Sequence, residues 1–181
     1  MTCQCSTEST TNTGVNPYSS SVVQLISGFT PGDTIKSVKI GIHSCSAKTF
    51  RIGVYSKVST SECGSRLSYV ETDETTIATP ELKSFSITQF DVPTGETELY
   101  VVITSSPTGV WQIQNETTTG TINSGYDTAV TYSTISSQTS GFTFNFENQE
   151  ILRTCLCTES APSPSGSSAR LPPPPIVLRS F

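Results

Sequence analysis

Apolar and polar residues alternate along most of residues 35–146, which is the pattern of β-strands with one buried face. The clearest alternating runs cover 38–42, 50–55, 85–92, 99–103 and 142–146. Weaker candidates cover 22–26, 66–70, 129–135 and 151–157. Phe142, Phe144 and Phe146, separated by two polar residues, predict the most regular half-buried strand. No stretch carries the 3.6-residue period of an amphipathic helix.

Turn sequences separate these runs. Pro31-Gly32, Pro93-Thr94-Gly95, Pro107-Thr108-Gly109 and Asn123-Ser124-Gly125 each combine residues that favour tight turns. About ten short strands at a spacing of about 8 to 12 residues are typical of all-β domains. The sequence therefore predicts an antiparallel β-sandwich with jelly-roll connections.

The composition changes after Cys157. We expect a disulfide-closed sandwich over residues 1–157 and an extended Pro/Ser-rich arm over residues 158–181. Four consecutive prolines favour polyproline II, and an apolar segment follows them. The residues expected to contact a neighbouring subunit, by strand addition to a sheet edge, are Pro172, Pro173, Pro174, Pro175, Ile176, Val177, Leu178 and Phe181.

Six cysteines form two Cys-x-Cys pairs near the ends of the sandwich and one wider pair. Residues i and i+2 of a strand share a face, so Cys3 and Cys5 could meet Cys155 and Cys157 if the first and last strands pair antiparallel. Closing this long loop would stabilise the fold by about 4 to 5 kcal/mol. Cys45 and Cys63 are the expected third disulfide. A zinc site and free thiols are the alternatives, although structural zinc sites favour Cys-x2-Cys and wider spacings.

Charge and composition narrow the functional classes. Only 14% of residues are charged, the formal net charge is -5, and Ser and Thr are abundant. Such chains are typical of extracellular and virion-surface proteins. No Lys/Arg cluster predicts nucleic-acid binding, and no apolar run approaches the length that spans a membrane. Met1 leads directly into polar sequence without a signal-peptide pattern, so export would use a removed leader or another route, such as a virus particle.

No residue set predicts a catalytic centre, a cofactor or a firm metal site. His43 is the only histidine, and no nucleophile motif accompanies it. The acidic residues are scattered, so a glycosidase is disfavoured. Asp33, Asp73 and Asp127 lie near turns, which leaves a structural calcium ion as an alternative. We therefore expect a protein that is not an enzyme.

Tyrosines are the best candidates for contact with surface glycans. Tyr55 and Tyr100 lie opposite the apolar face of their strands, so we expect both to face outward, where a ring could bind a sugar or pack against a neighbouring strand. Trp111 alternates with Ile113 and is expected in the core. Asn115 begins an Asn-Glu-Thr glycosylation sequon.

Two segments carry a resemblance to known modules. The strand FRIGVYS at 50–56 and the later FDVPTGETELYVVI at 90–103 resemble jelly-roll β-sandwich modules of extracellular and surface proteins, over residues 35–135. That resemblance implies a fold similar to carbohydrate-binding modules and a role in adhesion or as a structural spacer, without catalytic residues.

These observations favour a structural subunit of an extracellular or virion-surface assembly, such as a fibre, filament or capsid. Its partners would be copies of itself or other subunits. A carbohydrate-binding or adhesion module is the alternative.

Overall fold

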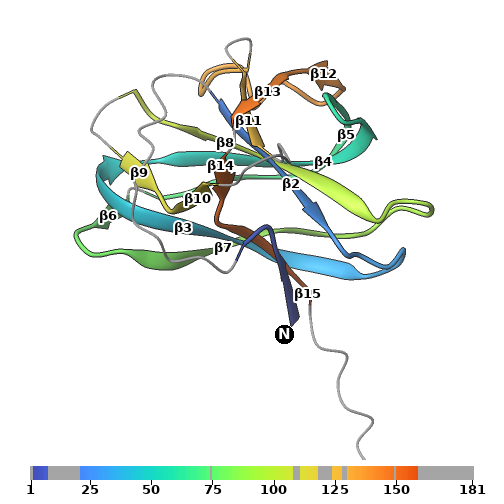
Figure 1. Cartoon of the computed structure of the whole chain (residues 1–181), viewed down its shortest axis with the longest axis horizontal. Helices are drawn as coiled ribbons and strands as arrows, with labels where there is room; N and C mark the ends of the chain where they lie inside the picture. The colour runs from blue at the N-terminus through green and yellow to red at the C-terminus, as the bar shows by residue number, and fades with distance from the viewer. Residues whose placement is uncertain are drawn as a thin grey trace, which may run out of the picture.

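The computed structural model describes residues 2–7, 21–73, 75–107, 111–117, 124–127, 130–148 and 150–158 of the 181-residue chain. Every helix or strand assigned within these residues is a β-strand, so the predicted all-β class is confirmed (Figure 1). None of the described segments forms an apolar helix long enough to cross a membrane.

The first sheet is organised around one long central strand, β3 (Thr34–Lys48). Its length of 15 residues lets it pair with two strands in succession along each side. The N-terminal part of β3 pairs with β15 and β7, and the C-terminal part pairs with β9 and β6, all antiparallel. β1 pairs with the outer side of β15. These strands are β1 (Thr2–Cys5), β15 (Thr154–Thr158), β9 (Trp111–Ile113), β7 (Glu81–Asp91) and β6 (Thr75–Ile77).

The second sheet has seven antiparallel strands in the order β12-β5-β4-β8-β2-β11-β13. Their bounds are β12 (Phe142–Thr143), β5 (Glu62–Glu71), β4 (Phe50–Ser59), β8 (Glu98–Ser105), β2 (Ser21–Ser27), β11 (Ser124–Asp127) and β13 (Asn145–Asn148). A small separate pair joins β10 (Asn115–Thr117) to β14 (Glu150–Leu152).

One hydrophobic core lies between the two sheets, the arrangement of a β-sandwich. Val38 and Ile40 of β3 face it from the first sheet, and Ile52 and Val54 of β4 face it from the second. Trp111 is also buried in this core, as its alternation predicts, with its ring 5.1 Å from that of Phe50. The period-two alternation of these strands therefore reflects a single shared interior.

A second hydrophobic cluster covers the outer face of the second sheet. Residues 130–144, here called the cover segment, contribute Val130, Ile135 and Phe144 to it. The sheet contributes residues of opposite parity to the main core, including Val102. Because β8 is therefore buried on both faces, its sequence is a continuous apolar run instead of an alternation.

Two strand predictions near the C-terminus differ from the structure. The run 142–146 is divided at Phe144 because β12 pairs with β5, whereas β13 pairs with β11 near the other edge of the sheet. The described part of 129–135 forms hydrogen-bonded turns, including an Ile135 N–H donated to the Thr131 carbonyl at 3.0 Å. The 130–135 turns lie between β11 and β12, so burial in the second cluster and not strand pairing determines their apolar pattern.

Candidate functional site

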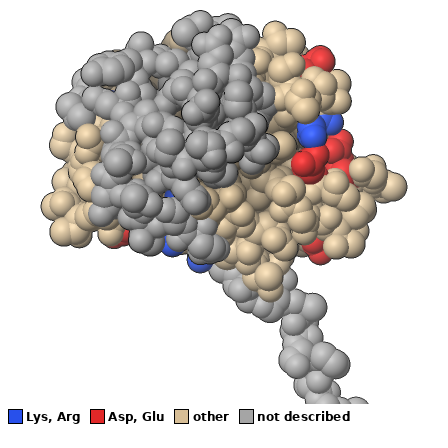
Figure 2. All heavy atoms as spheres, viewed as in Figure 1, with Lys and Arg blue, Asp and Glu red and all other residues tan. Residues whose placement is uncertain are grey.

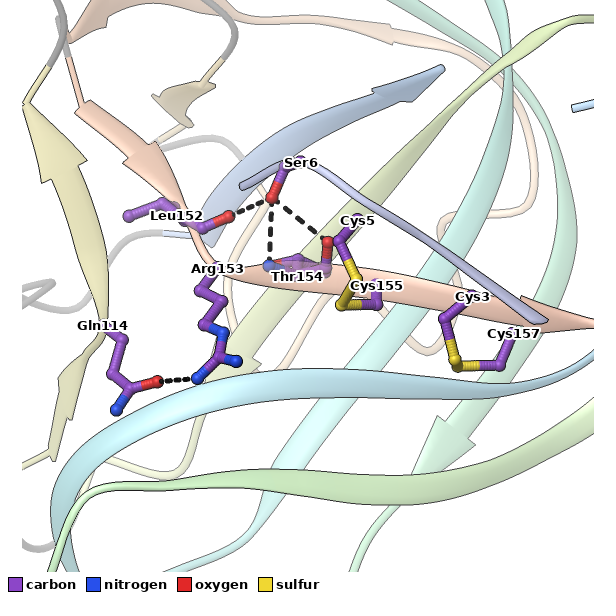
Figure 3. Close-up of a disulfide and its surroundings, with 9 residues drawn as sticks. All are labelled: Cys3, Cys5, Ser6, Gln114, Leu152, Arg153, Thr154, Cys155 and Cys157. Carbon is purple, nitrogen blue, oxygen red and sulfur yellow. Dashed lines mark hydrogen bonds between the residues drawn. A yellow bond between two sulfur atoms is a disulfide. The ribbon is translucent and has the colours of Figure 1, made fainter. Parts of the chain in front are cut away.

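Two disulfides join the first strand to the last. Cys3 bonds to Cys157 and Cys5 to Cys155, each directly opposite the other across the β1–β15 pair (Figure 3). The Cα atoms of each pair are 4.0 Å apart, close to the spacing of non-hydrogen-bonded antiparallel pairs. Since such positions recur every second residue, the Cys-x-Cys spacing places both bonds on one face. Residues 2–5 and 154–158 are called the clasp below.

Ser6 extends the clasp beyond the last disulfide. Its N–H donates to the Thr154 carbonyl at 2.9 Å, and its hydroxyl accepts the Thr154 N–H at 3.0 Å. The same hydroxyl donates to the Leu152 carbonyl (Figure 3). Cys155 and Cys157 are fully buried. Backbone, side-chain and covalent bonds therefore act together on a strand pair of only four register positions.

Gly41 allows three strands to meet beside the clasp. The Gly41 N–H donates to the Arg153 carbonyl at 2.8 Å, and the Gln114 N–H donates to the Gly41 carbonyl at 2.7 Å. Arg153 Nη1 also donates to Gln114 Oε1 at 3.0 Å (Figure 3). A Cβ atom at Gly41 would lie 2.6 Å from that Oε1 and 2.9 Å from Arg153 Cβ. A larger residue would therefore separate β9 and β15 at this junction.

The expected Cys45–Cys63 disulfide is wrong. Neither residue is in a disulfide, and the two lie in different layers: Cys45 on β3 in the main core and Cys63 on β5 in the second cluster. The second sheet separates them, because its two faces bound the two clusters. Sequence spacing could not reveal this, since both cysteines flank β4 along the chain.

Cys45 is not arranged as a nucleophile. Burial raises the pKa of its thiol, which donates to the Thr75 carbonyl at 3.4 Å. Nearby Lys48 is also buried, which lowers its pKa, and its Nζ donates to the Ser106 carbonyl. Desolvation thus favours the neutral thiol over the reactive thiolate.

Tyr55 and Tyr100 are buried, which corrects their expected role as exposed glycan-binding candidates. Both do lie on the outer face of the second sheet, but the cluster under the cover segment reduces their exposure to 0%. The Tyr55 hydroxyl donates to the Gln138 carbonyl at 2.9 Å, and the Tyr100 hydroxyl donates to the Ser59 carbonyl at 2.7 Å. Burial raises the pKa of Tyr55 to about 12 and raises that of Tyr100 as well. The alternation along each strand predicted the correct face of the sheet for both tyrosines, but it could not predict that the cover segment lies over that face.

Two arginines attach the cover segment to the second sheet, and sequence reasoning did not single them out. Arg51 donates to the Tyr132 carbonyl at 2.6 Å, and its guanidinium lies 4.1 Å from the centre of the Tyr132 ring. Its ion pair with Glu71 lowers the pKa of that carboxyl. Arg66 donates to the carbonyls of Ile135 and Ser136, each at 2.9 Å. Alternation shows that these side chains face away from the main core, but it does not show which residues they contact.

A groove of about 400 Å³ lies between the ends of β5 and β7. Its floor includes Val70 and the nearly buried Phe85, and its rim carries hydroxyl, acidic and basic side chains. The full lining is Val70, Glu71, Thr72, Asp73, Thr75, Lys83, Ser84, Phe85 and Ser86, referred to below as the groove.

The remaining candidates give no reaction centre in the part of the chain that is described. Figure 2 shows charged side chains in small, separated groups on the visible face. His43 lies within β3 and is half-buried. No group of three or more His, Cys, Asp or Glu residues that could hold a metal ion occurs among the described residues. Asp33 instead accepts the Thr30 N–H in a turn at 2.9 Å.

Two predictions fall outside this description. The arm residues Pro172–Pro175, Ile176, Val177, Leu178 and Phe181 lie outside the described residues. Asn115 belongs to β10, but its side chain is not described. Subunit contact through the arm and glycosylation at Asn115 remain predictions.

Comparison of the chain with protein-family models, with curated proteins and with solved structures finds no match. The function is therefore argued from the clasp, the groove and the sequence of the arm.

Proposed function

We propose that the protein is a non-enzymatic structural subunit of an extracellular or virion-surface assembly, a fibre, filament or capsid, in which residues 158–181 dock on a neighbouring subunit. One observation carries this proposal: two disulfides join the strand nearest the N-terminus to the strand that leads into the arm. The end of β15 is thereby fixed covalently to the body at the point where the arm begins.

The clasp determines where a pulling force would go. Cys3 and Cys157 are 154 positions apart in sequence, so the chain from β2 to β14 lies inside one covalent loop. A force applied to the two ends passes through the Cys3–Cys157 bond and does not load the strands within the loop. Without both disulfides, the force would separate the β1–β15 hydrogen bonds one after another.

The disulfides also support the proposed location. Disulfides persist in oxidising environments and on virion or cell surfaces, and they are rare in reducing cytosol. Two of them in a chain with few charged residues suit an extracellular protein or one exposed on a particle.

We further infer that the sandwich is a jelly roll, the fold of many capsid and lectin domains. The strand orders β1-β15-β3-β7 in one sheet and β2-β8-β4-β5 in the other support this inference. The first and last strands are neighbours, and these eight strands, taken in chain order, alternate between the sheets except at β4 and β5. This interleaving is what two Greek keys produce.

Carbohydrate binding or adhesion is the weaker alternative, because the two tyrosines on which it rested are buried.

Deleting residues 171–181 tests the proposal. We expect the shortened chain to retain its thermal unfolding temperature but to sediment as a monomer, whereas the full chain sediments as an assembly. A shortened chain that forms the same assemblies as the full chain would contradict the proposal.

A further inference from the structure

We propose that the groove beside β7 is the receptor for the arm, and that residues 176–181 of a second copy of the chain add there as an extended strand. This inference rests on the proposed function and specifies the partner surface that it requires. It is an interaction site between two different regions of the same protein.

β7 has an open edge along the groove. Among the described strands it pairs only with β3, so no described strand forms a backbone ladder with its other side. Residues Ser84–Phe90 contain no charged residue and no proline, although edge strands usually carry such residues to prevent pairing with another chain. A long uncharged edge is therefore a surface suited to strand addition.

β5 and β7 are close at one point and separate toward the groove. The Ser68 hydroxyl of β5 donates to the Thr88 carbonyl at 2.7 Å, which closes the space between the two strands at that position. The groove opens further along, beside Lys83–Ser86, with Val70 and Phe85 at its floor. An entering strand would therefore find backbone partners on β7 and an apolar surface beneath.

The sequence of the arm complements this lining. Ile176, Val177, Leu178 and Phe181 supply apolar side chains, and Arg179 is the only charged side chain of residues 171–181. The rim of the groove carries the exposed carboxylates of Asp73 and Glu71, the latter ion-paired with Arg51, and one amine, that of Lys83, so Asp73 is the acidic side chain that Arg179 would meet. The preceding prolines favour an extended chain, which lowers the entropy lost when a strand docks.

The direction of β15 favours a second copy over the chain's own groove. β15 and β7 both run antiparallel to β3, and both Thr158 and Phe90 pair with Ile35. β15 therefore ends beside the Phe90 end of β7 and points away from Lys83–Ser86. To reach its own groove, the arm would have to reverse this direction, whereas docking on another subunit requires no reversal.

Lysine substitutions on the exposed positions of the edge test the site in the full chain. We expect S84K/S86K to reduce assembly at least tenfold in sedimentation velocity, because two charges on this edge oppose pairing. T94K is the matched control, since Thr94 is exposed in the turn after β7 and lies outside the groove. For the 83–86 amides that point away from β3, hydrogen exchange should show protection that rises with protein concentration and is absent in I176D/L178D.

The outcomes separate the two proposals. Normal assembly of S84K/S86K, together with loss of assembly in I176D/L178D, would overturn the groove as receptor while leaving the structural role of the arm. Protection of the amides of 83–86 that point away from β3, if independent of concentration and lost in I176D/L178D, would show docking of the chain's own arm and overturn the second copy as occupant. Assembly that survives the arm substitutions would overturn the proposed function itself.

Discussion

The clasp, at an edge of the first sheet, and the cover segment, on the outer face of the second, are held in place by different means. The clasp joins short strands through two disulfides, in which Cys155 and Cys157 are buried and Cys3 and Cys5 are half-buried. The cover segment consists mainly of turns and loop. It is held by aromatic burial and by hydrogen bonds from Arg51 and Arg66.

The difference follows from what each region can bury. β1 offers only four residues and sits at a sheet edge, where a strand of that length is easily lost. The cover segment instead places Phe142 and Phe144 against the rings of Tyr55 and Tyr100, at 5.3 and 5.0 Å. Large aromatic surfaces can hold a segment that has few strand hydrogen bonds, whereas a short strand benefits most from a covalent link.

The largest expected effect is loss of both disulfides, and it should not be the sum of two single losses. Either bond alone closes the long loop; the other then closes only a small ring of residues 3–5 and 155–157. We expect C3S/C157S or C5S/C155S to lower the free energy of unfolding by about 2 kcal/mol or less, and the fourfold variant by at least about 5 kcal/mol.

Urea denaturation of these variants measures the effect. C45A is the control, because it leaves both disulfides and should keep the full sensitivity to reductant. Single losses of about 5 kcal/mol each would contradict the nested arrangement.

Removing an aromatic side chain from the cover segment should have the next largest effect. Phe144 is nearly buried beside Tyr100, so F144A should lower the free energy of unfolding by about 3 kcal/mol. V58A is the control, since Val58 is 61% exposed and its truncation should change the stability by less than about 0.5 kcal/mol. Equal effects of the two substitutions would show that the cover segment is not packed on the sheet.

Alkaline pH should weaken the cover by a smaller amount. The pKa of Tyr55 is raised to about 12, whereas a tyrosine in the unfolded chain ionises near 10. Between these values the unfolded state loses the proton and the folded state keeps it, so stability falls as pH rises. We expect the free energy of unfolding to fall by about 2 kcal/mol between pH 9 and pH 12, and to fall by less in Y55F.

Denaturation at several pH values, with tyrosinate absorbance recorded in parallel, checks this prediction. A change of stability with pH that is the same in Y55F and in the parent chain across this range would contradict it.

The sequence predicted well which segments form strands. It predicted poorly which residues from distant parts of the chain contact them. Alternation located β3, β4 and β7, because each residue's face follows from its parity, whereas β8 was located as a continuous apolar run. It placed Tyr55 and Tyr100 on the correct face but not beneath a cover, since the covering residues follow about 30 to 90 positions later. The Cys45–Cys63 pairing failed for the same reason: distance across layers is not encoded in spacing. The Cys-x-Cys pairing was predicted correctly because the spacing of two residues within a strand determines which face they share and therefore which residues they oppose.

Single-molecule pulling on the two ends of the full chain tests the central claim, that the clasp carries axial force in place of the sandwich. In oxidising buffer we expect no lengthening from the 154 positions between Cys3 and Cys157. After reduction, the same pull should unfold the domain and release about 500 Å of chain, at about 3.5 Å per residue. Release of that length from the oxidised chain would contradict the claim.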